Sequence, residues 1–138
     1  MFKYKIFVSD SSIHGKGLFT NEFIQKGSVI WSLENNSIED KIDIIDCSRL
    51  LVLESCYEFE KVKDILLYSI YKKGKFYYYL DENKYINHSL DSNAFTQEDF
   101  SVISTRDINI GEEITENYNT YYKDNLLLMF YKKYDIEL

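Results

Sequence analysis

The chain has 138 residues, of which 45% are hydrophobic and 28% are charged, and its formal net charge is −7. This length supports one domain with a sizeable core. The longest apolar run, residues 126–131, is far shorter than the roughly 20 residues of a membrane span. No signal peptide is visible, so we expect an intracellular protein, cytoplasmic or nuclear, with delivery into a host cell left open. The net negative charge and the scattered lysines argue against binding of nucleic acid. They suit a partner with a basic surface.

The cysteines and histidines do not form a metal-binding pattern. Cys47, Cys56, His14 and His88 are four candidate zinc ligands, but they lack the close pairs of a structural zinc site. We therefore expect no metal and reduced cysteines. Aromatic residues make up 17% of the chain and proline is absent. A/T-rich codon usage and core packing account for most of these rings, which leaves a few for a ligand site.

The N-terminal part of the chain is predicted to form short strands and then a helix. Strands are predicted over residues 3–8 and 28–33, the second with a buried Val-Ile-Trp run. Residues 37–53 are predicted to be one helix, because Ser37 can cap it and isoleucines recur at helical spacing.

The remainder alternates β-prone runs with polar turns. A hairpin is predicted from residues 65–71 and 75–80 around a Lys-Lys-Gly turn. Short strands are expected over 101–104 and 113–115, and residues 122–134 have the apolar spacing of a helix. These elements predict a mostly β fold with short helices.

Three segments place polar and turn-forming residues where precise positioning is expected, namely residues 15–19, 84–93 and 106–118. The first has two glycines flanking one residue, which lets the backbone approach a ligand or adopt positive φ. The second crowds Asn, His, Ser and Asp into seven residues. Taken singly, each segment also fits an ordinary surface turn or hairpin.

Taken together, these segments resemble the SET domain of protein-lysine methyltransferases. The family pattern of G-x-G-l-f, then N-H-S with a later asparagine, then G-E-E-i-t-x-x-Y appears as GKGLF, YINHSLDSN and RDINIGEEITENY. The resemblance covers residues 6–122. It implies small curved β-sheets, a β-clip and a C-terminal pseudoknot, in which the last motif passes beneath the NHS loop. That crossing would bring Asn87, His88 and Tyr118 together.

The resemblance also implies a cofactor and a set of site residues. The cofactor is S-adenosylmethionine, and the catalytic residue is Tyr118. Lys16 and Gly17 would contact the methionine part of the cofactor, whereas Asn87 and His88 would bind its amino and adenine ends. The substrate-channel candidates are Phe95, Tyr122 and Trp31, and for Trp31 simple core burial is the alternative.

The same resemblance suggests a domain division and partners. Residues 1–122 are expected to form the SET domain, and residues 123–138 a helical tail. No cysteine-rich zinc segment follows Tyr118, so this tail is a candidate to complete the substrate channel or to form a dimer contact. The expected partner is a protein with an exposed lysine, such as a histone tail, with a homodimer left open and neither nucleic acid nor membrane expected. The alternatives are a degenerate SET domain that acts as an interaction module and an aromatic-rich structural protein.

Overall fold

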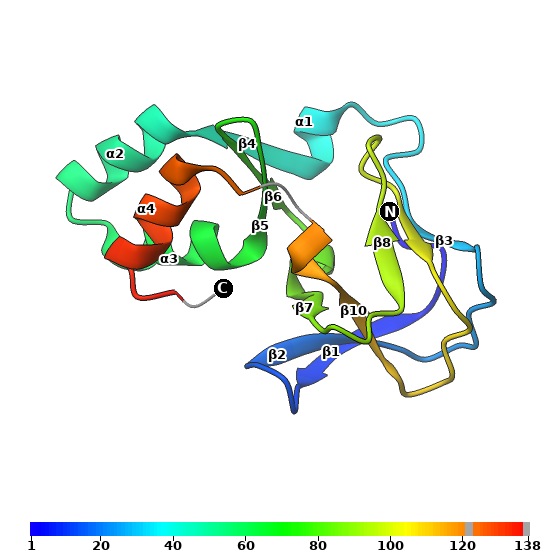
Figure 1. Ribbon diagram of the computed structural model, residues 1–138. Coiled ribbons are helices and arrows are strands. Elements are labelled where there is room, and N and C mark those ends of the chain that lie inside the picture. The colour runs from blue at the N-terminus through cyan, green and yellow to red at the C-terminus, as the bar shows by residue number, and fades with distance from the viewer. Residues whose placement is uncertain (121–122, 137–138) are drawn as a thin grey trace. The chain divides into compact units, whose positions relative to one another are not determined.

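The computed structural model describes residues 1–120 and 123–136 (Figure 1). The chain divides into two compact units. The first comprises Met1–Ile38 and Asp81–Thr120, and the second comprises Glu39–Leu80 and Tyr121–Leu138. Within the described residues, no helix has both the length and the apolar character to span a membrane.

The first unit is built on short strands. Its elements are β1 (Ile6–Asp10), β2 (Lys16–Thr20), β3 (Val29–Trp31), the 3₁₀ helix η1 (Glu82–Tyr85), β7 (Asn87–His88), β8 (Ala94–Thr96), β9 (Val102–Ser104), β10 (Glu113–Glu116) and the 3₁₀ helix η2 (Tyr118–Thr120). The sheet order is β1-β2-β10-β8-β9-β3, with β7 paired to β10. Its core includes Leu18, Ile30 and Ile114, none of which has exposed surface.

Strand β10 holds this unit together, because it pairs with β2 from the N-terminal segment and with β7 and β8 from the segment after residue 80 (Figure 1). It runs antiparallel to β2, with Ile114 opposite Leu18. It also runs parallel to β7, with Thr115 opposite Asn87, and parallel to β8. Parallel pairing of this kind joins segments that no hairpin can connect. The C-terminal motif therefore lies directly beside the NHS segment.

The second unit combines helices with a small sheet. Its elements are α1 (Ile38–Lys41), which begins in the first unit, β4 (Ile42–Asp46), α2 (Cys47–Ser55), α3 (Phe59–Tyr68), β5 (Ser69–Lys72), β6 (Lys75–Tyr79) and α4 (Asn125–Lys133). The sheet order is β4-β6-β5. Leu127 and Phe130 of α4 are buried in the same core cluster as Leu50 of α2 and Leu66 of α3.

The single helix predicted over residues 37–53 is wrong. Residues 42–46 form β4 instead, antiparallel to the aromatic strand β6, with Ile45 opposite Phe76. The isoleucine spacing fits a helix, but β-branched side chains also pack well on a sheet, and the aromatic partner decides between them. Asp46 then caps α2 at its N-terminus, since its carboxylate accepts the backbone N–H of Arg49 at 2.9 Å.

The predicted hairpin is confirmed, but its first strand starts later. Residues 65–68 belong to α3, and the strand begins at Ser69. Lys73 and Gly74 at the turn both have positive φ, as a two-residue hairpin loop with the native strand twist requires. The predicted C-terminal helix is also confirmed as α4, which Asp124 caps by accepting the backbone N–H of Leu127 at 2.9 Å.

Candidate active site

Asn87 on β7 lies where the three sequence motifs meet. Its side-chain nitrogen lies 3.0 Å from the carbonyl oxygens of His14 and Lys16 and 3.0 Å from a carboxylate oxygen of Glu113. The residue is 7% exposed. One side chain from the NHS segment is therefore bonded to both the GKG segment and the GEE segment.

Gly17 lies where the space that a Cβ atom would take is already occupied. A Cβ atom there would lie 2.7 Å from Oε2 of Glu113 and 3.0 Å from Cβ of Ser11. The other oxygen of Glu113 accepts the Ser11 hydroxyl at 2.7 Å. Of the two glycines in this motif, only Gly15 has positive φ, at +43°. Gly17 thus serves close packing rather than an unusual backbone conformation.

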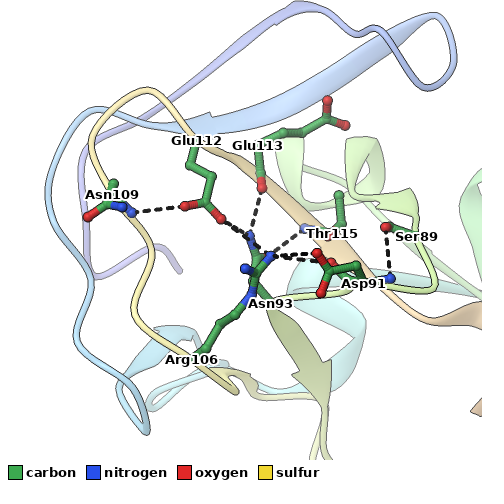
Figure 2. Close-up of polar contacts among 8 residues, drawn as sticks. All are labelled: Ser89, Asp91, Asn93, Arg106, Asn109, Glu112, Glu113 and Thr115. Carbon is green, nitrogen blue, oxygen red and sulfur yellow. Dashed lines mark hydrogen bonds and ion pairs between the residues drawn. The ribbon is translucent and has the colours of Figure 1, made fainter.

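A second polar cluster fixes the loop after the NHS segment. Figure 2 shows the side chain of Asn93 between Glu112, Glu113 and Thr115. Its nitrogen donates to Oε2 of Glu112 at 2.9 Å and to the carbonyl of Glu113 at 2.8 Å, and its oxygen accepts the N–H of Thr115 at 2.9 Å. Arg106 lies 3.5 Å from Glu112. Because Asn93 is only 1% exposed, these bonds satisfy an amide that would otherwise be costly to bury.

Tyr118 lies against His88 immediately after β10. Its backbone N–H donates to Nδ1 of His88 at 2.9 Å, and its hydroxyl donates to the carbonyl oxygen of Ile86. The two ring centroids are 5.3 Å apart. Nδ1 of His88 is therefore the acceptor in this contact, which leaves Nε2 as the ring nitrogen not engaged by Tyr118. The phenol is thus held by the residues on either side of Asn87.

Ser89 takes part in the turn rather than in a nucleophile arrangement. Its hydroxyl oxygen accepts the backbone N–H of Asp91 at 3.1 Å, as Figure 2 shows, and its own N–H donates to the carbonyl of Glu116 at 2.9 Å. Glu116 is 5% exposed, and its carboxylate accepts the Thr96 hydroxyl at 2.5 Å. These bonds anchor the NHS turn to the end of β10.

Apart from the main chain of Lys16 and Gly17, the other predicted site groups are not gathered around Asn87 in the same way. The Lys16 side chain pairs with exposed Asp10 at 2.6 Å, which lowers the pKa of Asp10 and raises that of Lys16. Trp31 has no exposed surface and donates its indole N–H to Asp81 at 2.7 Å, which is the core placement left open by the sequence. Phe95 lies on β8 and is 42% exposed. Tyr122 lies outside the described residues.

Sequence reasoning missed two groups that complete the site, the carboxylate of Glu113 and the carbonyl of Ile86. The Glu-Glu pair was a usable signal for the first, because adjacent residues entering a strand point to opposite faces. The Ile86 carbonyl had no such sequence signal, because every residue has a backbone carbonyl. No group of three or more His, Cys, Asp or Glu side chains suited to a metal occurs in residues 1–120 and 123–136.

Comparison with known proteins identifies the family. The SET domain family model matches residues 15–119, and the chain belongs to this family. It is 32% identical over 130 residues to a Plasmodium falciparum (isolate 3D7) protein named "Putative histone-lysine N-methyltransferase 1", covering 83% of this chain and 2% of that protein.

Solved structures agree on the fold. A structure of ctPRC2 in an autoinhibited conformation bound to S-adenosylmethionine matches 94% of this chain and 17% of its own, with a TM-score of 0.62 and 20% identity. A humanized mutant of the Chaetomium thermophilum Polycomb Repressive Complex 2 bound to GSK343 matches 96% of this chain and 17% of its own, with a TM-score of 0.62 and 18% identity. The predicted mostly β SET-domain fold is thus confirmed. The chain spans only a small part of each of these relatives.

Proposed function

We propose that this protein transfers a methyl group from S-adenosylmethionine to the ε-amine of a lysine in a protein substrate. The observation that carries the proposal is the pairing of β10 with β7, which brings Tyr118 against His88 and next to Asn87. Membership of the SET family and likeness to a methyltransferase relative support it. The role of each site residue is part of the proposal.

The residues present fit this cofactor. The nitrogen of Asn87 is surrounded by three acceptors, so its oxygen is the atom left to accept a hydrogen bond from an ammonium group. The backbone at Lys16 and Gly17 lies beside this amide. Asn87 and the main chain at these positions would therefore hold the amino-acid end. When bound, S-adenosylmethionine supplies an electrophilic methyl group on a sulfonium sulfur.

Tyr118 is suited to align an amine. Its hydroxyl hydrogen is engaged by the Ile86 carbonyl, so the phenol oxygen offers lone pairs to an N–H of the target lysine. Holding two reactants in line supplies a large part of the rate in a displacement reaction. The hydrogen bonds that Tyr118 donates to His88 and Ile86 fix its backbone and its ring at once, as such alignment demands.

The target amine has to lose a proton before it reacts. A lysine with a pKa of about 10.4 is almost wholly protonated at neutral pH. Apolar surroundings and a neighbouring positive charge both lower that pKa, so a desolvated channel would favour the neutral amine. The net charge of −7 favours a basic protein segment as substrate, because opposite charges speed encounter. A histone tail is one segment of this kind.

Methyl incorporation tests the proposal. The full chain is incubated with S-adenosylmethionine that carries a labelled methyl group and with histones or a whole-cell protein extract. We expect label in protein, recovered as methyl-lysine after hydrolysis. A Tyr57→Phe variant controls for the loss of a phenol elsewhere, since Tyr57 is 81% exposed in the second unit, and it should retain activity. If S-adenosylmethionine binds but no protein is labelled over this panel, the chain is an interaction module instead.

A further inference from the structure

We propose that Glu113 is a positioning residue for the cofactor: its carboxylate clamps the turn between β1 and β2 onto Asn87, so that the Asn87 amide oxygen is presented to the ammonium group of S-adenosylmethionine. This inference rests on the proposed function and extends it to a residue that makes no contact with the reacting atoms. Glu113 would act only through Asn87.

The first step is the orientation of the Asn87 amide. Its nitrogen has three oxygen neighbours, the carbonyls of His14 and Lys16 and the carboxylate of Glu113, each at 3.0 Å. With the amide turned over, its oxygen would face three other oxygens, which is strongly repulsive. Among the residues that the structure describes, none donates to the Asn87 oxygen. The orientation of the amide is therefore fixed, and its oxygen is the atom that would accept an incoming donor.

The second step is what holds the two carbonyls in place. His14 lies in the β1–β2 turn and Lys16 is the first residue of β2, and this stretch packs against the Glu113 side chain. Oε1 of Glu113 accepts the Ser11 hydroxyl at 2.7 Å, and Oε2 lies over Gly17 where no Cβ would fit. The same Ser11 oxygen accepts the N–H of Ile13 at 3.0 Å. One carboxylate thus bridges the turn, Asn87 and β10.

The third step is the contrast with the neighbouring glutamate. Glu112 and Glu113 point to opposite sides of the chain, and Figure 2 shows the Glu113 carboxylate directed away from Asn93 while Glu112 faces it. Glu112 supports the loop that follows the NHS segment, through Asn93 and Arg106. Of the two glutamates, Glu113 is the one whose carboxylate lies against the GKG segment. The two residues therefore form a matched pair for a test.

The experiment measures binding, not turnover. S-adenosylhomocysteine carries the ammonium group, whereas 5′-methylthioadenosine lacks the whole amino-acid part, and both are titrated into the full chain by calorimetry. For Glu113→Ala we expect about a tenfold loss of affinity for S-adenosylhomocysteine, which is about 1.4 kcal/mol, and less than a twofold change for methylthioadenosine. Glu113→Gln keeps an acceptor toward Asn87, because the Ser11 hydroxyl can turn to accept, and should restore most of the affinity.

Further variants separate positioning from general damage. In an Asn87→Ala background, Glu113→Ala should cause no further loss of S-adenosylhomocysteine affinity. Glu112→Ala should weaken both ligands alike. If Glu113→Ala does not fold, Ser11→Ala removes one end of the same clamp and should shift the affinity ratio in the same direction, by about threefold.

Three results would overturn the inference. These are equal losses for the two ligands in Glu113→Ala or Ser11→Ala, a Glu113→Gln loss as large as that of Glu113→Ala, and additive losses in the double variant. A wild-type chain that binds neither ligand would overturn the proposed function itself, and the inference with it.

Discussion

Tyr118 and His88 form the contact on which the proposed chemistry most depends. The imidazole accepts a hydrogen bond from the Tyr118 backbone N–H, and the Ile86 carbonyl accepts one from the Tyr118 hydroxyl. The resemblance to the SET family predicted that these residues would meet, but it did not predict which atoms join them. A histidine next to a catalytic candidate is easily read as a base. Here it is a structural acceptor for the chain segment that carries the tyrosine.

Replacing His88 by alanine should loosen that segment. The Tyr118 N–H would lose its acceptor, and leaving a half-buried donor unpaired costs about 1–3 kcal/mol. We expect the free energy of unfolding to fall by this amount, measured by urea denaturation, and methyl transfer to fall more than tenfold. His14→Ala is the control, because that residue contacts Asn87 through its carbonyl only. Equal effects of the two variants would contradict the role of His88.

Gly17 and Glu113 should be energetically coupled. In Gly17→Ala the new Cβ would lie 2.7 Å from the Glu113 carboxylate, so overpacking should cost about 1–3 kcal/mol of unfolding free energy. Glu113→Ala removes the closest of these contacts and leaves that with Cβ of Ser11 at 3.0 Å. We therefore expect the double variant to lose clearly less than the sum of the two single losses in urea denaturation. Strict additivity would mean that the two groups do not meet.

At the scale of elements, strand β10 explains why the site forms and why part of the fold escapes prediction. Its pairing with both β2 and β7 depends on segments far away in sequence, so periodicity could not place it, whereas the family resemblance could. In the second unit no motif helped. The isoleucines of residues 42–46 fit helix and strand equally well until β6 lies beside them, and the helix α3 was hidden by aromatic, β-prone letters at its end.

The end of α4 should make the stability of the second unit pH-dependent. Burial raises the pKa of Glu54. The hydrogen bonds from Lys133 at 2.8 Å and Tyr134 at 2.7 Å outweigh this effect, so the net pKa lies below the ordinary 4.5. A carboxyl with a lowered folded-state pKa stabilises the fold above 4.5 and loses that contribution as the pH falls through its folded-state value.

A Glu54→Gln variant tests this directly. We expect wild type to lose stability between pH 6 and acidic pH, and the variant to lose less over the same interval, by urea denaturation at each pH. Tyr134→Phe serves as a partial control, since it removes one of the two hydrogen bonds to Glu54. Parallel pH profiles for wild type and Glu54→Gln would show that the Glu54 carboxyl has the same pKa in the folded and unfolded states.

At the scale of the whole molecule, the chain combines a strand-built unit that holds the motifs with a helical unit that contains the C-terminal tail. The sequence was enough to predict the family, the fold class and the meeting of Asn87, His88 and Tyr118. It was not enough to predict the division into units, because residues 39–80 carry no motif and their core is shared with α4. The role of the tail in completing the substrate channel or in a dimer contact stays a prediction.

A Tyr118→Phe variant, compared with wild type in a single turnover with labelled S-adenosylmethionine and a basic protein substrate, tests the proposed methyl transfer most directly. The variant loses only one oxygen, so it should bind S-adenosylhomocysteine within about threefold of wild type while the rate falls by about 100-fold, which is about 2.7 kcal/mol of transition-state alignment. Equal rates for the two proteins, with equal binding, would show that the phenol beside the Asn87–His88 turn takes no part in the reaction.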